Sequence, residues 1–175
     1  MPKPITWYRP GRVVVSAGGY RYKLEAPYGA EFDPSFQPQL SPTQMLERGV
    51  FEGKYMNDAR GEFPIEWFRS ARLSLRADPS INEYKTKSRL SLDEWRKRGW
   101  IHEPDKKGWF EWYCRYYVGR RIPDLDALQI KRWRAFRRHA GQLRRHCPGA
   151  LLYDMTCRAR QKQALLQWAY DPKAL

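Results

Sequence analysis

The residues best suited to chemistry lie in one polar segment, residues 53–64, of sequence GKYMNDARGEFP. Asp58 stands in its middle, between an apolar segment and a helix that we expect to begin at Pro64. Side chains on turns that rigid neighbours hold in place are often functional. A single carboxylate there can orient water or stabilise an oxocarbenium-like sugar, so it can serve the hydrolysis of an N-glycosidic bond in DNA without a metal.

The neighbours of Asp58 are of types that contact nucleic acid. Lys54 and Arg60 can bind phosphates, and Tyr55 and Asn57 can contact a base. The structural alternative is that Asp58 only caps a turn.

A second candidate carboxylate, Asp154, comes just before the last helix, which we expect over residues 158–170. Its structural alternative is helix capping. Arg158, Arg160 and Lys162 lie in the first turns of that helix, where their charge opposes the helix dipole, and a bound anion would offset this.

The longest predicted helix covers residues 124–146 and has two contrasting faces. Helical spacing predicts a buried stripe of Leu125, Leu128, Trp133, Phe136, Ala140 and Leu143. The other side is basic, with Lys131, Arg132, Arg134, Arg137, Arg138, Arg144 and Arg145. No acid occurs from position 127 to 153. A helix face that is only exposed to solvent usually mixes acidic and basic residues to form i,i+4 ion pairs, and this face cannot form them. We expect Arg132, Arg137 and Arg138 to bind phosphates, together with Arg158 and Arg160.

Aromatic residues are abundant, with eight Trp, eleven Tyr and seven Phe. They are densest in a helix expected over residues 108–121, where Trp109 and Trp112 are candidates for stacking on bases. The structural alternative is that most of these rings form the core. Net charge is +14, from 33 Lys and Arg against 19 Asp and Glu, which favours a polyanionic partner.

Several classes of site are missing from the sequence. It has no phosphate-binding P-loop, dinucleotide-binding glycine motif or nucleophile elbow, so we expect no cofactor. Its histidines and cysteines lack metal-ligand spacing, so we expect no metal. Cys114, Cys147 and Cys157 do not form a complete set of pairs, which indicates a reducing compartment, the cytoplasm, or the nucleus in a eukaryote. We expect no signal peptide, because residues 1–4 lead into no apolar segment, and no membrane-spanning segment, because no run of 18 apolar residues occurs.

The predicted fold is α+β, a mainly helical single domain with an N-terminal β-hairpin. Residues 1–10 form an extended arm, residues 11–40 the hairpin and a Pro-rich loop, and residues 41–175 the helical core. The hairpin pairs residues 13–15 with 20–24 around a Gly-Gly turn. Capping boxes and terminal glycines place helices at residues 41–49 and 91–99, and a further helix is expected from Pro64 to about residue 75.

Three stretches resemble a largely uncharacterised family of small, basic, Trp-rich proteins. They are residues 53–58 (GKYMND) with 62–64 (EFP), 108–117 (GWFEWYCRYY) and 157–164 (CRARQKQA), and the similarity spans about residues 40–172. The chain also resembles anti-phage DNA glycosylases that excise modified bases, although no single motif carries that likeness. The sequence patterns of uracil-DNA glycosylases are missing.

These observations give one leading hypothesis and two alternatives. The first is a monofunctional DNA glycosylase that acts on a modified base, with Asp58 as catalytic carboxylate and a role in phage defence. The second is a non-catalytic module that binds DNA or RNA. The third is an adaptor for an acidic protein, which needs only the charge.

Overall fold

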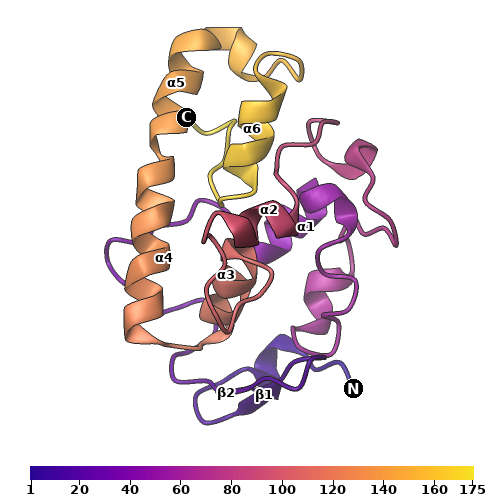
Figure 1. Cartoon of the computed structure of the whole chain (residues 1–175), viewed down its shortest axis with the longest axis vertical. Coiled ribbons are helices and arrows are strands. Elements are labelled where there is room, and N and C mark those ends of the chain that lie inside the picture. The colour runs from indigo at the N-terminus through magenta and orange to yellow at the C-terminus, as the bar shows by residue number, and fades with distance from the viewer.

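Helix α3, Trp109–Val118, lies at the centre of the structure, a computed structural model that describes all 175 residues (Figure 1). Every residue of α3 except Tyr117 is buried. The helix ends at Gly119, whose carbonyl accepts hydrogen bonds from the N–H groups of Glu25 and Ala26. A side chain at Gly119, which has a φ of 122°, would collide with the Ala26 carbonyl, so only glycine lets the loop pass so close.

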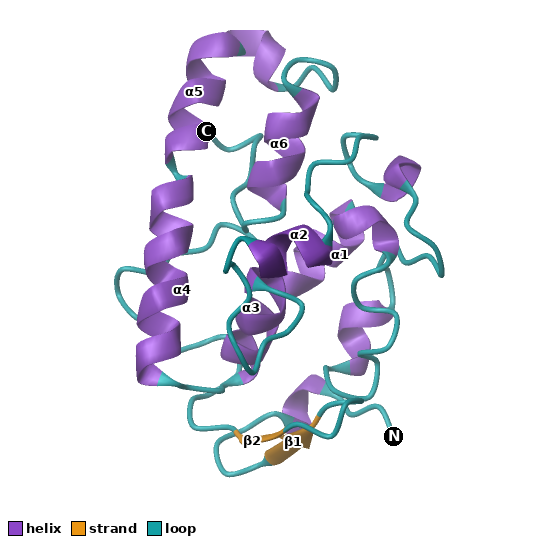
Figure 2. Cartoon of the chain, in the orientation of Figure 1, coloured by secondary structure: helices purple, strands orange, loops and turns teal.

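The remaining helices surround α3 and are joined by long loops (Figure 2). Their bounds are α1 Pro42–Arg48, α2 Leu92–Lys97, α4 Pro123–Phe136, α5 Arg138–His146 and α6 Ala159–Leu166. The starts of α1 and α2 confirm the predicted caps, since Ser41 accepts from the Gln44 N–H and Ser91 from the Glu94 N–H. The last helix is shorter than predicted.

The predicted helix over residues 124–146 is two helices that meet at Arg137. The Trp133 carbonyl, the regular partner of the Arg137 N–H, instead accepts the Tyr170 phenol at 2.6 Å. The Arg137 N–H bonds to the Arg134 carbonyl, one residue closer than in an α-helix. The predicted stripe is buried at Trp133, Ala140 and Leu143, but Leu128 is exposed.

The predicted helix over residues 64–75 is wrong. Only Ile65–Phe68 is helical, as a short 3₁₀ turn. Beyond it, the Arg72 N–H bonds to the Leu46 carbonyl and the Ser74 N–H to the Gly53 carbonyl. These long-range partners replace the i→i−4 bonds that a helix needs. Other 3₁₀ turns are Ile5–Trp7, Phe51–Gly53, Pro79–Ile81 and Gly149–Leu152.

The N-terminal hairpin is confirmed. Strands β1, Val13–Val15, and β2, Arg21–Lys23, pair antiparallel, with Val14 opposite Tyr22. Both of these side chains point into the core, whereas their neighbours face outward. The arm before the hairpin is not fully extended, because it forms the turn at Ile5–Trp7 and buries Tyr8.

A cluster of buried charges, called here the Arg115 cluster, lies between α3 and the hairpin, whose Tyr22 phenol donates to Glu62 at 3.0 Å. It consists of Arg115, Arg120, Glu62, Asp105 and Glu111. Arg115 is 3% exposed and pairs with Glu62 at 2.7 Å and with Asp105 at 2.8 Å. Arg120 holds both oxygens of Asp105, at 2.8 and 2.5 Å. The pairing matters because an isolated buried charge is strongly destabilising.

The fold is a single α+β domain, as predicted. One continuous hydrophobic core runs from Tyr8 in the arm to Tyr170 after α6. None of the helices is both long enough and apolar enough to cross a membrane.

We predict that Asp105→Ala destabilises the protein by about 3–5 kcal/mol, because it leaves two buried guanidinium groups without their shared carboxylate. Urea unfolding followed by circular dichroism measures this change. The matched control is Asp93→Ala, which breaks the exposed pair with Arg96 and should cost at most about 1 kcal/mol. Equal losses in the two variants would contradict a structural role for the cluster.

Candidate nucleic-acid-binding site

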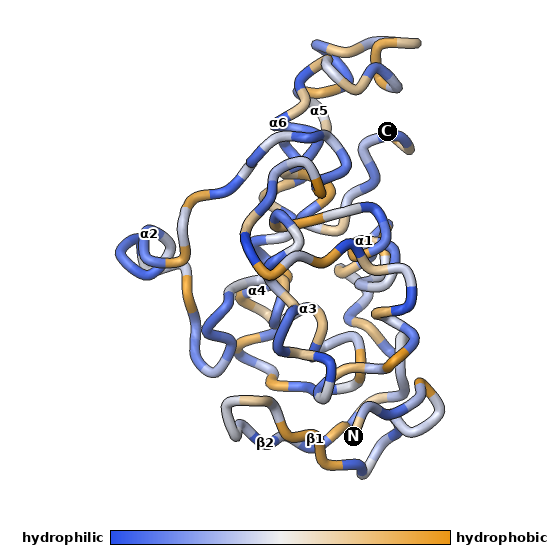
Figure 3. The backbone as a smooth tube through the Cα atoms, turned by 90° about the vertical axis from the view of Figure 1, so that its right-hand side faces the viewer, coloured by the Kyte–Doolittle hydropathy of each residue, from blue (hydrophilic) through white to orange (hydrophobic).

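A pocket of about 450 Å³ opens between α2, α4 and the end of α6, and is called here the aromatic pocket. Its walls carry Trp95 and Trp100 from α2 and the turn after it, Trp109 from α3, Phe136 from α4 and Trp168 from the end of α6. Figure 3 shows α2 standing away from the rest of the chain. The pocket therefore has a projecting wall on one side and the packed core on the other.

The aromatic rings of the inner wall form a stack. Trp168 lies between Trp109, at 4.8 Å and 27° between ring planes, and Phe136, at 4.9 Å and 13°. The indole N–H of Trp109 donates to the Gln129 carbonyl, which fixes that ring. Trp168 is half-buried and both of its ring faces are covered, so the stack borders the pocket with ring edges, whereas Trp100, which is 40% exposed, is the accessible indole of the lining.

Three arginines, Arg89, Arg132 and Arg138, also line the aromatic pocket. Arg89 is neutralised by buried Glu52 at 3.0 Å. Arg132 is half-buried, lies 5.5 Å from the Trp168 ring centroid and donates only to neutral oxygens, including the Trp100 carbonyl. Burial lowers its pKa. Neither Arg132 nor Arg138 has a carboxylate partner, so the pocket combines ring faces with uncompensated positive charge.

No Asp or Glu lines the aromatic pocket. Asp58 instead lines a second, polar pocket of about 200 Å³ beside the hairpin turn. There it is exposed and forms an ion pair with Lys107. Glu62 and Glu111 line the same pocket, and burial raises the pKa of Glu111. The predicted catalytic carboxylate and the predicted phosphate-binding arginines are therefore in different sites.

The other residues predicted around Asp58 do not form a base-binding surface. Tyr55 stacks on Phe51 at 4.6 Å, behind the wall of the aromatic pocket, and burial raises its pKa. The Asn57 amide donates to the Ser74 carbonyl, so it stabilises the fold and is not free to contact a base.

The two predicted phosphate ligands of this segment have different environments. Lys54 is exposed, and Arg60 lies with its guanidinium 5.3 Å from the Phe68 ring centroid. Both remain available to solvent, but neither lines the aromatic pocket.

The prediction that Trp112 stacks on a base is wrong. Its side chain is fully buried, and its indole N–H donates to Asp126 at 2.8 Å. Trp109 from the same helix does line the pocket. Helical periodicity places both residues on the buried face, and only the packing of α6 decides which one borders a cavity.

Asp154 has a structural role. Its carboxylate accepts the backbone N–H and the hydroxyl of Thr156, both at 2.7 Å, and these bonds lower the pKa of Asp154. It closes a turn before α6, whereas the N-cap position of α6 is Arg158.

The predicted arginines divide into two groups. Arg132 and Arg138 line the aromatic pocket. Arg137, Arg158 and Arg160 are exposed and make no ion pair. Sequence reasoning missed Trp95, Trp100 and Trp168 as site residues; the available signal was two Trp in the otherwise charged segment DEWRKRGW, at positions 93–100.

Cys147 and Cys157 form a disulfide, and Cys114 is free and buried. Two of the three cysteines thus pair, so the cysteines no longer support a reducing compartment. No group of three or more His, Cys, Asp or Glu is arranged to hold a metal ion.

We predict that His139 makes stability depend on pH. Its ring lies 4.4 Å from Phe136 and 3.3 Å from the Gln161 amide, with Arg138 and Gln142 as its other polar neighbours. Burial, then the Arg138 charge, lower its pKa below the ordinary 6.5. The unfolded chain therefore binds the proton first, and stability falls as the pH drops through that ordinary value.

Urea unfolding at pH 7.5 and pH 5 tests this expectation. The His139→Gln variant should lose less stability than the parent over this range. His146→Gln, at an exposed position on α5, is the control and should follow the parent. A parent and His139→Gln variant with the same pH dependence would contradict the prediction.

Comparisons with protein-family models, with curated proteins and with solved structures found no match to this chain. The family resemblance drawn from the sequence remains a prediction, and the candidate function depends on the geometry of the site.

Proposed function

We propose that this protein binds nucleic acid and holds an unpaired base in the aromatic pocket. The observation that carries the proposal is Arg132, a half-buried cation without a counter-ion at the edge of a stack of aromatic rings. Such a pair of features fits a ligand with a flat ring and an attached anion. A nucleotide has both, because a base carries a π-face and its phosphate a negative charge.

The surface near the pocket supports a polymer as the ligand. Exposed basic side chains follow α4 and α5 without an ion pair: Lys131, Arg134, Arg137, Arg138, Arg144 and Arg145. Mutual repulsion of these charges is unfavourable in the free protein, and a phosphate backbone relieves it. The pocket would then anchor one base while the helices bind the adjoining phosphates.

The arrangement favours the non-catalytic alternative over the glycosylase hypothesis. Base excision needs a carboxylate beside the sugar of the extruded base. The lining of the aromatic pocket supplies none, and Asp58 belongs to the polar pocket with Lys107 as its partner. DNA, the partner expected from the sequence, is the proposed polymer, and RNA serves as the comparison.

We predict that Trp100→Ala, which removes the accessible indole of the pocket, and Arg132→Gln weaken binding to single-stranded DNA. Loss of stacking on one base costs about 1–3 kcal/mol, or roughly 5- to 150-fold in Kd, which fluorescence anisotropy measures. Arg132→Gln should also reduce the slope of log K against log salt by about 0.7, the value for one phosphate of a single strand.

Two variants outside the pocket serve as matched controls. Trp7→Ala removes a half-buried tryptophan of the N-terminal arm, and Arg69→Gln removes an exposed arginine after the 3₁₀ turn at Ile65–Phe68. Both should bind like the parent. A loss in the controls as large as in the pocket variants would contradict a specific base pocket.

We further predict that Asp58 is dispensable. Asp58→Asn should leave DNA affinity unchanged, and neither parent nor variant should create abasic sites in normal or modified DNA. Alkali-induced strand breakage measures such sites. If the parent produces them and Asp58→Asn does not, the protein is a glycosylase and the non-catalytic proposal is wrong.

A further inference from the structure

The loop closed by the disulfide, residues 147–157, exposes three large apolar side chains. Leu151 is 46% exposed, Tyr153 64% and Met155 41%. The loop lies at the end of the molecule where α5 meets α6, away from the hairpin (Figures 1 and 3). Apolar side chains gathered at an exposed tip are typical of an interaction surface.

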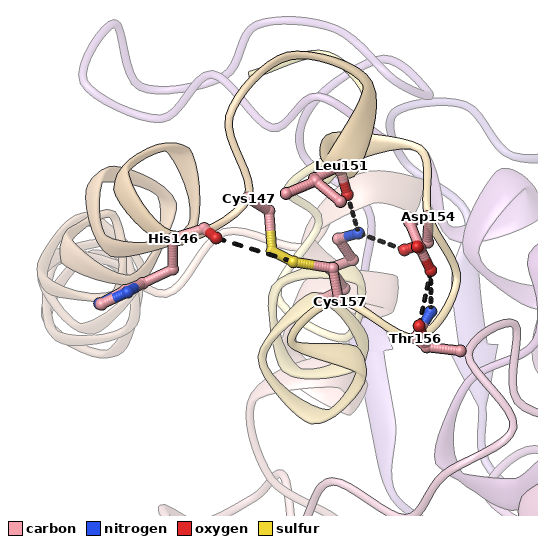
Figure 4. The surroundings of a disulfide bond; sticks show 7 residues. His146, Cys147, Leu151, Asp154, Thr156 and Cys157 are labelled. Carbon is pink, nitrogen blue, oxygen red and sulfur yellow. Dashed lines mark hydrogen bonds between the residues drawn. A yellow bond between two sulfur atoms is a disulfide. The ribbon is translucent and has the colours of Figure 1, made fainter.

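The loop is held by interactions from inside. Besides the disulfide, the Lys162 ammonium donates to the carbonyls of Leu151, at 3.1 Å, and Asp154, at 2.6 Å. Lys162 is fully buried and has no carboxylate partner, and burial lowers its pKa. Figure 4 shows the disulfide on one side of the loop and the hydrogen-bonded pair of Asp154 and Thr156 on the other.

The disulfide and the Lys162 hydrogen bonds, on the inner side of the loop, determine where its apolar side chains lie. The backbone carbonyls turn inward to satisfy the ammonium, since a buried charge without hydrogen bonds is costly. Leu151, Tyr153 and Met155 consequently point outward on a backbone that is already ordered. A pre-ordered loop loses less conformational entropy when it binds than a flexible one.

The charge around the loop indicates the chemistry of its partner. Exposed arginines flank both of its ends, Arg144 and Arg145 on α5 and Arg158 and Arg160 at the start of α6. The one acid of the loop, Asp154, is engaged with Thr156. Stacked bases offer apolar faces, and the phosphates beside them carry negative charge. Apolar wedge residues of DNA-bending proteins insert between bases in such surroundings.

We infer that the Cys147–Cys157 loop is a wedge that inserts between bases of the nucleic acid held along α4 and α5. The inference rests on the proposed function and adds to it a way of distorting the bound strand. Helix α5, nine residues long, separates the pocket residue Arg138 from the loop. Its length of roughly 14 Å, at about 1.5 Å per residue, corresponds to about four base pairs of duplex at ~3.4 Å each.

A short duplex with one unpaired base and a fluorophore at each end tests the wedge. Binding of the parent protein should raise energy transfer between the ends, because an inserted wedge bends duplex DNA by about 20–90°. The variant with Leu151→Ala, Tyr153→Ala and Met155→Ala should still bind through its arginines, with affinity lowered roughly fivefold or more, but should not bend the duplex. All three side chains are exposed, so the fold is retained.

Two further variants sharpen the test. Leu75→Ala changes an apolar side chain that is 90% exposed outside the loop and should bend DNA like the parent. The pair Cys147→Ser and Cys157→Ser keeps Leu151, Tyr153 and Met155 but removes the disulfide that closes the loop, and should reduce bending while the salt dependence of binding stays the same.

The outcomes separate the wedge from the proposed function. If the parent binds the duplex without bending it, or the triple variant bends it equally, the wedge is wrong and nucleic-acid binding stands. If the parent binds no nucleic acid, both are wrong. If the triple variant binds and bends DNA like the parent but, unlike the parent, no longer binds vesicles of anionic lipid, the tip is a membrane contact and the wedge is overturned.

Discussion

The buried pairing of Arg115 with Glu62 and Asp105 is the constraint on which the rest of the structure depends. Helix α3 carries Glu111 and Arg115 as well as its aromatic residues, and it is almost wholly buried. A buried charge is tolerated only when an oppositely charged side chain pairs with it, and for Arg115 two such side chains come from other parts of the chain. The partners come from residue 62 and from residue 105, so the pairing fixes α3 relative to two loops, and the Tyr22 phenol, which donates to Glu62, joins the hairpin to them.

The position of α3 in turn shapes the aromatic pocket. Its first residue, Trp109, stacks on Trp168 and thus brings the end of α6 against the start of α3. The neighbouring Tyr170 stacks on Trp133, and its phenol donates a hydrogen bond to the Trp133 carbonyl. Because that carbonyl would otherwise accept from the Arg137 N–H, the long helix breaks at Arg137. After the break, α5 runs from Arg138 to the disulfide loop.

The two pockets differ in the charges that line them. Carboxylates gather in the polar pocket beside the hairpin, where lysine and arginine neutralise them. The aromatic pocket and the surface of α4 and α5 have arginines without partners. Positive charge is therefore unbalanced where flat rings are accessible, which is why the proposed ligand is a nucleotide chain rather than a small cation or a metal.

The sequence by itself determined the elements that depend on neighbours a few residues away. The caps at Ser41 and Ser91 and the hairpin turn are local hydrogen-bond patterns, so residue type and spacing predict them. Tertiary structure decided the rest. The break at Arg137, the failure of a helix after Phe68, and the pocket built from Trp95, Trp109 and Trp168 all depend on partners far away in the sequence. No local pattern shows whether a tryptophan is fully enclosed, as Trp112 is, or borders a cavity, as Trp109 does, because packing between distant segments sets that difference.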